Sequence, residues 1–278
     1  MSAPDQQTID RLIDASLSED VGAGDLTSAA ILAKGARLEL VMCTRQDIIV
    51  AGLDIAVQVF LRLAPDADVV CLRKDGERVP SGGQLMTLEG PAQGLLSAER
   101  TALNIVQMLS GIATETGRYV DAIAGTGAVL LDTRKTIPGL RVLSKYATRM
   151  GGATNHRMAL DDGVLIKDNH IAAAGSVAQA VKLAQDAGLQ DIEVECDNLE
   201  QVAQGIAAGA AKILLDNMSN DELCQAVEMT GGRIALEASG GVSLASIRAI
   251  AQTGVDFISV GRITQSAGAV DIGLDIKS

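Results

Sequence analysis

Residues 191–216 read DIEVECDNLEQVAQGIAAGAAKILLD and contain the repeating unit that decides the fold. The apolar run that ends at Glu195 predicts a strand, residues 199–208 predict a helix, and the run that ends at Asp216 predicts a second strand. Two strands joined through a helix in this way lie parallel in one sheet. We therefore expect a parallel sheet in this part of the chain.

The same alternation extends from residue 129 to residue 261. The six predicted strands are VLLD ending at Asp132, VLIK ending at Lys167, DIEVE ending at Glu195, KILLD ending at Asp216, RIALEA carrying Glu237 and VDFISVG ending at Gly261. The predicted helices between them cover residues 140–150, 177–187, 199–208, 221–229 and 244–252. Strands that are buried on both faces should be apolar up to the last residue, and a polar residue there faces the mouth where β/α barrels hold their active sites. Since no GxGxxG follows the first strand, these polar strand ends favour a barrel, or part of one, over a dinucleotide-binding sheet.

The amino-terminal part predicts a separate lobe. Residues 8–19 and 95–124 have helical periodicity, and the second of these helices is expected to be interrupted near Gly111. Short strands are predicted at residues 38–42, 47–50, 69–72 and 84–88. We expect two domains, residues 1–115 and 116–269, and the final segment 270–278 is a candidate to pack back on the first.

Composition restricts the partners of the chain. The 278 residues carry a formal net charge of −12, which disfavours nucleic acid and anionic membranes but allows a small anion in a local basic pocket. The sequence shows no signal-peptide pattern of a basic segment followed by an apolar one, and no apolar run of membrane-spanning length. We therefore expect a cytoplasmic protein. The four cysteines form no CxxC pair and are expected to be reduced core residues: Cys43, Cys71, Cys196 and Cys224.

A basic segment, residues 133–160, interrupts this acidic chain and contains no Asp or Glu. Arg141, Lys145 and Arg149 are spaced four apart and are expected to form one solvated helix face. The other basic residues follow a strand or lie in a loop: Arg134, Lys135, His156 and Arg157. Because the guanidinium fork suits carboxylate and phosphate, we predict an anion site from this second group.

Two carboxylates are expected at the mouth of the barrel, because Glu195 and Asp216 end successive predicted strands. Mg²⁺ prefers a few carboxylates together with water and substrate phosphates, so this pair predicts a magnesium site. The alternative is a structural ion pair with Lys167 or other residues of the mouth.

Glycines follow the last two predicted strands. Ser239, Gly240 and Gly241 lie between a strand and a helix, and Gly261 follows the next strand. Late strands of β/α barrels often bind phosphate at such positions through free backbone N–H groups, although turn glycines would also be expected here.

Other classes of enzyme lack support. The two histidines are too few and too scattered for a zinc site, and neither a GxSxG nucleophile motif nor a GxxxxGK[ST] phosphate loop is present. The pattern alone therefore indicates a barrel enzyme that binds a phosphorylated, carboxylated substrate with a divalent ion.

Several long motifs, in order, resemble the quinolinate phosphoribosyltransferase family over nearly the whole chain. They are EDVGAGDLT (19–27), ERTALNIVQMLSGIAT (99–114), LLDTRKTIPGLR (130–141), GGATNHRMALDDGVLIKDNHI (151–171), EVE (193–195), LLDN (214–217) and EASGG (237–241). The resemblance implies an α/β protein of the type II phosphoribosyltransferase kind, with an N-terminal α/β sandwich lobe and an open, incomplete β/α barrel. It also implies a homodimer, or a multiple of dimers, with shared active sites.

The resemblance further implies the activity: transfer of a phosphoribosyl group from phosphoribosyl diphosphate to quinolinate, with Mg²⁺, giving nicotinate mononucleotide, diphosphate and carbon dioxide. By this resemblance, Arg134, His156 and Arg157 would bind quinolinate, together with Arg100 from the partner subunit, and Thr133 would be a further substrate-binding residue. Lys135 and Lys167 would line the junction of the two substrates, and Glu195 and Asp216 would face the ribose and the magnesium diphosphate. The 5-phosphate would bind at Ser239, Gly240, Gly241 and Gly261.

Two rival interpretations remain open at this point. One is a homologous pyrophosphorylase linked to molybdate transport, although the residues around Lys167 to His170 follow the quinolinate enzyme. The other is a silent barrel that only binds a phosphorylated ligand, which would have no need of Lys135, Glu195 and Asp216 together.

Overall fold

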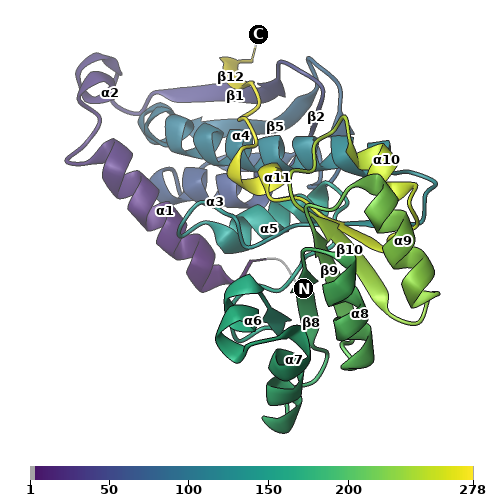
Figure 1. Ribbon diagram of the computed structural model, residues 1–278. Helices are drawn as coiled ribbons and strands as arrows, with labels where there is room; N and C mark the ends of the chain where they lie inside the picture. Colours follow the sequence, from purple (N-terminus) through teal and green to yellow (C-terminus); the bar gives the residue numbers. More distant parts are fainter. Residues whose placement is uncertain (1–3, 278) are drawn as a thin grey trace. The chain divides into compact units, whose positions relative to one another are not determined.

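The computed structural model describes residues 4–277, which divide into two compact units (Figure 1). The first unit comprises the chain up to Gly117, residues 138–152, and the segment from Ser266 onward. The second unit comprises residues 118–137 and 153–265. Residues 138–152, which the sequence pattern assigned to the second domain, therefore belong with the first unit.

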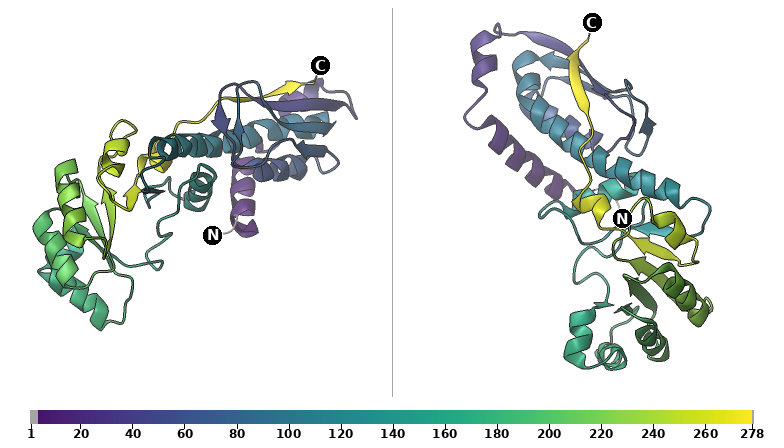
Figure 2. Two further views of the ribbon diagram at one scale, coloured as in Figure 1. Left: turned by 90° about the vertical axis from the view of Figure 1, so that its right-hand side faces the viewer. Right: turned by 45° about the horizontal axis from the view of Figure 1, so that its top comes forward.

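The first unit is built on an antiparallel sheet with the strand order β12-β1-β5-β3. The strands are β1 (Arg37–Thr44), β3 (Asp68–Cys71), β5 (Gln84–Pro91) and β12 (Ile272–Ile276), beside a separate pair of β2 (Ile48–Ile49) and β4 (Arg78–Val79). Strand β12 pairs with β1 over Leu40–Thr44, so the end of the chain completes a sheet that the amino-terminal part begins (Figure 2).

Helices of the first unit supply its apolar core. They are α1 (Gln6–Val21), α2 (Leu26–Ile31), α3 (Leu53–Leu63), most of α4 (Ala92–Ala122) and α5 (Arg141–Met150). Helix α1 buries Ile9, Ile13 and Leu17, which recur every four residues and form one face. Asp25 caps helix α2 by accepting a hydrogen bond from the N–H of Ser28 at 2.9 Å.

Helix α4 continues through Gly111, so the predicted interruption there is wrong. A Cβ atom at this glycine would lie 2.1 Å from the carbonyl oxygen of Gly268. The glycine therefore permits close approach of another backbone segment and does not break the helix. Helices α2 and α3 were not anticipated from the sequence.

Cys71 and Cys224 are exposed, so the expectation of four core cysteines is wrong for these two, which lie on edge strand β3 and on α9 (Asn220–Thr230).

The second unit contains a six-stranded parallel sheet with the order β6-β11-β10-β9-β8-β7. Its strands are β6 (Val129–Leu131), β7 (Leu165–Ile166), β8 (Glu193–Cys196), β9 (Lys212–Asp216), β10 (Ala235–Ser239) and β11 (Phe257–Ser259). Its other helices are α6 (Asp168–Ala174), α7 (Val177–Asp186), α8 (Leu199–Ala207), α10 (Ile247–Ala251) and α11 (Arg262–Gln265). Since β6 and β7 lie at opposite edges of this sheet, the predicted open, incomplete barrel is confirmed.

The two faces of this sheet differ in chemistry. Val194, Ile213, Leu215, Leu236 and Ile258 belong to the apolar core, together with side chains of helices α7 to α10. Residues of the other parity along the same strands include charged side chains: Glu193, Glu195, Lys212, Asp216 and Glu237. The expectation that these strands are apolar up to the last residue is therefore wrong, because one face lines a polar interior.

Among the described residues, no helix has both the length and the apolar character needed to cross a membrane.

Candidate active site

A pocket of about 220 Å³ lies on the polar face of the parallel sheet, within the second unit. It is lined by Thr133, Arg134, Lys135, His156, Arg157, Leu165, Lys167, Glu195, Leu214, Asp216, Glu237, Ser239 and Ser259. Most of the predicted site residues are thus brought together, although they come from loops and strands far apart in the sequence. Gly240, Gly241 and Gly261 follow or neighbour the lining residues, and Arg100 is an exposed residue of α4 in the first unit.

Strand register explains why the lining side chains converge. In the parallel ladder, Glu195 pairs with Leu214, and Asp216 pairs with Ser239. Side chains two residues apart on a strand point to the same face, so Glu195, Leu214 and Asp216 share one side of the sheet. Glu195 and Asp216 therefore lie on the same face of adjacent strands, as their positions in the sequence predicted.

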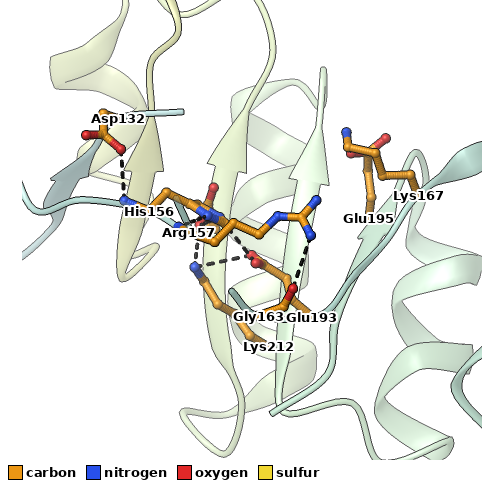
Figure 3. Close-up of polar contacts among 9 residues, drawn as sticks. Asp132, His156, Arg157, Gly163, Lys167, Glu193, Glu195 and Lys212 are labelled. Carbon is orange, nitrogen blue, oxygen red and sulfur yellow. Dashed lines mark hydrogen bonds and ion pairs between the residues drawn. The ribbon is translucent and has the colours of Figure 1, made fainter. Parts of the chain in front are cut away.

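Glu195 forms an ion pair with Lys167. The Nζ of Lys167 donates to Oε2 of Glu195 at 2.6 Å, with side chains 47% and 10% exposed respectively (Figure 3). The ion pair considered as an alternative to a metal site is therefore present on this carboxylate. Asp216 accepts a hydrogen bond at 2.7 Å from the side-chain amide of Asn217.

Two arginines concentrate positive charge in the pocket. The Nε of Arg134 is buried and has no hydrogen-bond partner among the described residues. The Nη1 of Arg157 donates to the carbonyl oxygen of Gly163 at 3.1 Å. Burial, followed by the charge of Arg134, lowers the pKa of Arg157 below its ordinary value. Like charges held near one another in this way favour binding of an anion.

The Ser239–Gly241 turn is tightly constrained. Gly240 and Gly241 have φ values of 90° and 58°, which glycine adopts without strain. A Cβ atom at Gly240 would lie 2.2 Å from Oδ1 of Asn217. The N–H of Asn217 also donates to the carbonyl oxygen of Ser239 at 2.9 Å, so the ends of β9 and β10 are held together next to the pocket.

A buried charged cluster includes three residues that the sequence analysis did not assign to the site: Glu193, Lys212 and Glu237. The Nζ of Lys212 lies 3.2 Å from Oε1 of Glu193 and also contacts Oε2 of Glu237. The Nε2 of His156 lies 3.3 Å from Glu193 Oε2 (Figure 3). The same nitrogen lies 3.5 Å from Glu237 Oε2. The signal available in the sequence was the alternation of charged and apolar residues in EVE and KILLD, at the period of a strand with one polar face.

Asp132 anchors the loop that carries His156. This buried carboxylate accepts from the N–H of His156 at 2.9 Å and from the side-chain amide of Asn155 at 2.5 Å. The N–H of Arg157 in turn donates to Nδ1 of His156 at 2.8 Å. The loop that follows Gly152 is therefore tied to the end of β6, and this places His156 and Arg157 in the pocket.

The three basic residues of α5 belong to the first unit. Lys145 is only 1% exposed, so the expectation of a solvated face formed by Arg141, Lys145 and Arg149 is wrong for its central member. The second basic group lines the pocket as expected.

The chain matches two domain families along nearly its whole length. "Quinolinate phosphoribosyl transferase, N-terminal domain" matches residues 25–110, and "Quinolinate phosphoribosyl transferase, C-terminal domain" matches residues 112–275.

Individual relatives agree with this. The chain is 43% identical over 260 residues to the probable carboxylating nicotinate-nucleotide pyrophosphorylase of Bacillus subtilis, covering 93% of this chain and 90% of that protein. It is 45% identical over 267 residues to the Mycobacterium leprae enzyme of the same name, covering 94% of each. Among solved structures, the nicotinate-nucleotide pyrophosphorylase of Francisella tularensis is 42% identical, with a TM-score of 0.95 and full coverage of both chains.

Proposed function

Because the chain belongs to the quinolinate phosphoribosyltransferase family, we propose that it transfers the phosphoribosyl group of phosphoribosyl diphosphate to quinolinate and releases carbon dioxide. The products are nicotinate mononucleotide, diphosphate and carbon dioxide. The relatives are named as carboxylating nicotinate-nucleotide pyrophosphorylases, and that name describes the same reaction in the reverse direction.

One observation carries the proposal: around a single pocket, cations come from loops beside the two edge strands, whereas carboxylates come from the strands between them. Arg134, Lys135 and Arg157 come from loops next to β6 and β7, whereas Asp216 and Ser239 end the central strands β9 and β10. A dicarboxylate fits the first group, because arginine donates paired hydrogen bonds to carboxylate oxygens. The buried Nε of Arg134, without a partner among the described residues, supports an anion at this place.

The carboxylates serve the ribose end of the reaction. As diphosphate leaves C1 of the ribose, positive charge develops on the ring, and Glu195 and Asp216 stabilise it electrostatically. The pyridine nitrogen of quinolinate then forms the new bond to C1. Lys135 and Lys167 lie where the two substrates meet and hold the diphosphate and the carboxylate that is lost.

Decarboxylation follows from the charge on the product ring. Once its nitrogen carries the ribose, the pyridinium stabilises the carbanion that remains when the adjacent carboxylate departs as carbon dioxide, and this carbon then takes a proton from water. Lys167 is paired with Glu195 at 2.6 Å, so its charge is partly neutralised. Such a cation binds the leaving carboxylate without stabilising it so strongly that the bond to carbon is kept.

Mg²⁺ is the proposed cofactor, with Glu195 and Asp216 as the residues that would hold it, directly or through water and diphosphate. Both are carboxylates on the same face of adjacent strands, which is the donor set that Mg²⁺ prefers. When bound, the ion would neutralise diphosphate beside these carboxylates. The 5-phosphate is assigned to Ser239, Gly240, Gly241 and Gly261, where glycines leave backbone N–H groups accessible.

The assembly is proposed to be a homodimer, or a multiple of dimers, in which Arg100 of one subunit binds quinolinate in the site of the other. Arg100 is exposed on α4 and so is accessible to a second copy of the chain.

A product assay tests the proposal. The purified protein is incubated with quinolinate, phosphoribosyl diphosphate and Mg²⁺, and nicotinate mononucleotide and carbon dioxide are quantified, with nicotinate as the control acceptor. Equal amounts of both products from quinolinate, and none from nicotinate, are expected. Tight binding of phosphoribosyl diphosphate without turnover of quinolinate would contradict the proposed reaction and leave only a phosphate-binding barrel.

A further inference from the structure

Lys135 lines the pocket although it belongs to no helix or strand. It lies in residues 132–140, between β6 and α5, and is exposed. A lysine side chain is a flexible stem that carries a compact charge, and ordering it costs conformational entropy. Contacts with other segments must therefore fix Lys135 if its ammonium is to stay at one place in the pocket.

The backbone of Lys135 is held at both of its polar groups. Its N–H donates to the hydroxyl oxygen of Thr133 at 3.0 Å, within the same turn. Its carbonyl oxygen accepts the hydroxyl proton of Thr264 at 2.7 Å, from a residue 129 positions further along the chain. Thr264 lies on α11 in the same unit and is only 2% exposed. This bond therefore ties the Lys135 turn to α11 at a place that water does not reach.

The single hydroxyl proton of Thr264 has two acceptors within reach. The carbonyl oxygen of Lys135 lies 2.7 Å away and that of Gly261 lies 2.9 Å away. The Gly261 oxygen already accepts from the N–H of Thr264 at 3.2 Å and from the N–H of Gln265 at 3.1 Å. Because a carbonyl oxygen has two lone pairs, these two donors satisfy it. The hydroxyl proton therefore serves Lys135, which is also the shorter contact.

Gly261 leaves room for the side chain of Lys135. A Cβ atom at this glycine would lie 2.8 Å from Cδ of Lys135 and 3.4 Å from its Cβ. The obstructed atoms belong to a flexible side chain and not to the backbone, so an added methyl group would redirect the lysine and leave the fold in place. The stem of Lys135 thus runs close to Gly261, where glycine permits the approach.

We propose that Thr264 is a positioning residue for Lys135: its hydroxyl fixes the backbone, Gly261 leaves room for the stem, and the ammonium is thereby directed to the junction of the two substrates. The last step rests on the proposed function. Thr264 lies outside the set of described residues that line the pocket, so it acts through Lys135 and not by contact with a substrate. Gly261 acquires a task for its missing side chain, separate from the phosphate binding assigned to its N–H.

Two replacements at Thr264 separate its hydroxyl from its shape. Valine keeps the volume and removes the donor, whereas serine keeps the donor. Thr264→Val is expected to lower kcat about tenfold, the scale of one lost hydrogen bond, with the KM for quinolinate changed by less than about twofold. Thr264→Ser should keep most of the activity. A higher KM with unchanged kcat in Thr264→Val would mean that the hydroxyl serves substrate binding and not Lys135, and would overturn the proposal.

Thr253→Val is the matched control. Thr253 donates at 2.7 Å to the carbonyl oxygen of Ile250, three residues earlier at the end of α10, as Thr264 does to Gly261. The control therefore removes a local hydroxyl contact but no contact with Lys135, and kcat should stay within about twofold. Equal losses of kcat in Thr253→Val and Thr264→Val would mean that removing any such hydroxyl impairs the protein, contrary to the proposal.

A double-mutant cycle tests whether Thr264 acts through Lys135. In a Lys135→Ala background, Thr264→Val is expected to change kcat by less than about twofold, because no ammonium is left to position. Gly261→Ala, which keeps the backbone N–H, should lower kcat in the unaltered protein and likewise have little effect beside Lys135→Ala. If the fold-changes multiply in the double variants, Thr264 and Gly261 act independently of Lys135 and the proposal is wrong.

Hydrogen exchange provides a readout that requires no turnover. The N–H of Lys135 is bonded to Thr133 while the turn is closed, so opening of the turn exposes it to exchange. Followed by mass spectrometry, residues 133–137 should exchange several-fold faster in Thr264→Val than in Thr264→Ser, Thr253→Val or the unaltered protein. Equal exchange in all four would overturn the proposal. If the protein failed to convert quinolinate, the proposed function would fail, whereas this measurement would still decide whether Thr264 holds the Lys135 turn.

Discussion

Lys167 is the pocket residue whose removal should affect chemistry most directly. Its ammonium donates to Glu195 at 2.6 Å, so Lys167→Ala removes a cation from the substrate junction and leaves a buried carboxylate without its partner. We expect kcat to fall by about a hundredfold or more, since electrostatic stabilisation of a transition state commonly contributes that much. Steady-state rates at saturating substrates measure the change.

Lys182→Ala is the matched control for this prediction. Lys182 is exposed on α7 and pairs with Asp186 four residues along the same helix, so its removal should leave kcat unchanged. Full turnover in both Lys167→Ala and Lys135→Ala would argue against any part of these lysines in decarboxylation.

Glu237 makes stability depend on pH. Burial raises the pKa of this carboxyl, but the hydrogen bond from His156 and the charge of Lys212 outweigh burial and lower it to about 2, from an ordinary value of 4.5. Because the folded-state pKa is the lower one, ionised Glu237 stabilises the fold above about pH 4.5. That contribution is lost as the pH falls from 4.5 towards 2.

Glu237→Gln tests this linkage. At neutral pH the variant should be less stable by on the order of 3 kcal/mol, since one member of a buried charge network is removed. Urea unfolding at a series of pH values should show the gap between variant and unaltered protein narrowing as the pH falls below 4.5. A gap of constant size down to pH 2 would mean that ionisation of Glu237 does not contribute.

At the scale of single elements, α4 shows how one backbone contact, at Gly111, outweighs the ordinary preference of a helix interior for alanine over glycine. A glycine in a helix interior ordinarily costs up to about 1 kcal/mol relative to alanine. At Gly111 the opposite order is expected, because an added Cβ would lie 2.1 Å from the Gly268 carbonyl oxygen, a backbone atom that cannot move alone. Gly111→Ala should therefore lower the free energy of unfolding by about 2 kcal/mol or more.

Gly205→Ala in α8 is the matched control, since the nearest atom to its added Cβ is a side-chain methyl group of Val194 at 3.2 Å. Thermal or urea unfolding of both variants should give a clearly smaller loss for Gly205→Ala. Equal losses would mean that backbone approach does not explain Gly111.

At the element scale, the sequence predicted where the parallel strands lie but not all of the charged residues on them. The position of each parallel strand was predicted, because short apolar runs bounded by helical segments have few alternatives. Glu193 and Lys212 were overlooked because the strands were expected to be apolar up to the last residue. Their partners come from other strands and from the His156 loop, and that proximity depends on register.

The whole molecule is expected to work as a dimer with shared sites, and hybrid dimers test this. Arg100→Ala and Arg134→Ala should each be inactive alone. Mixed in equal amounts and allowed to exchange subunits, they should regain about a quarter of unaltered activity, since half of the dimers are hybrids with one intact site of two. No recovery after proven exchange would place Arg100 within the site of its own chain.

Sequence by itself determined the parallel α/β unit, the pair of carboxylates on successive strands and the basic loops that flank them. These features depend on local periodicity and on the fixed geometry by which parallel strands place their carboxyl ends together. Tertiary structure alone decided that Gly111 lies within a continuous helix, that residues 138–152 belong with the first unit, and that Lys212 joins Glu193 and Glu237 beneath His156. Each of these depends on contacts between segments far apart in the chain, which no local pattern encodes.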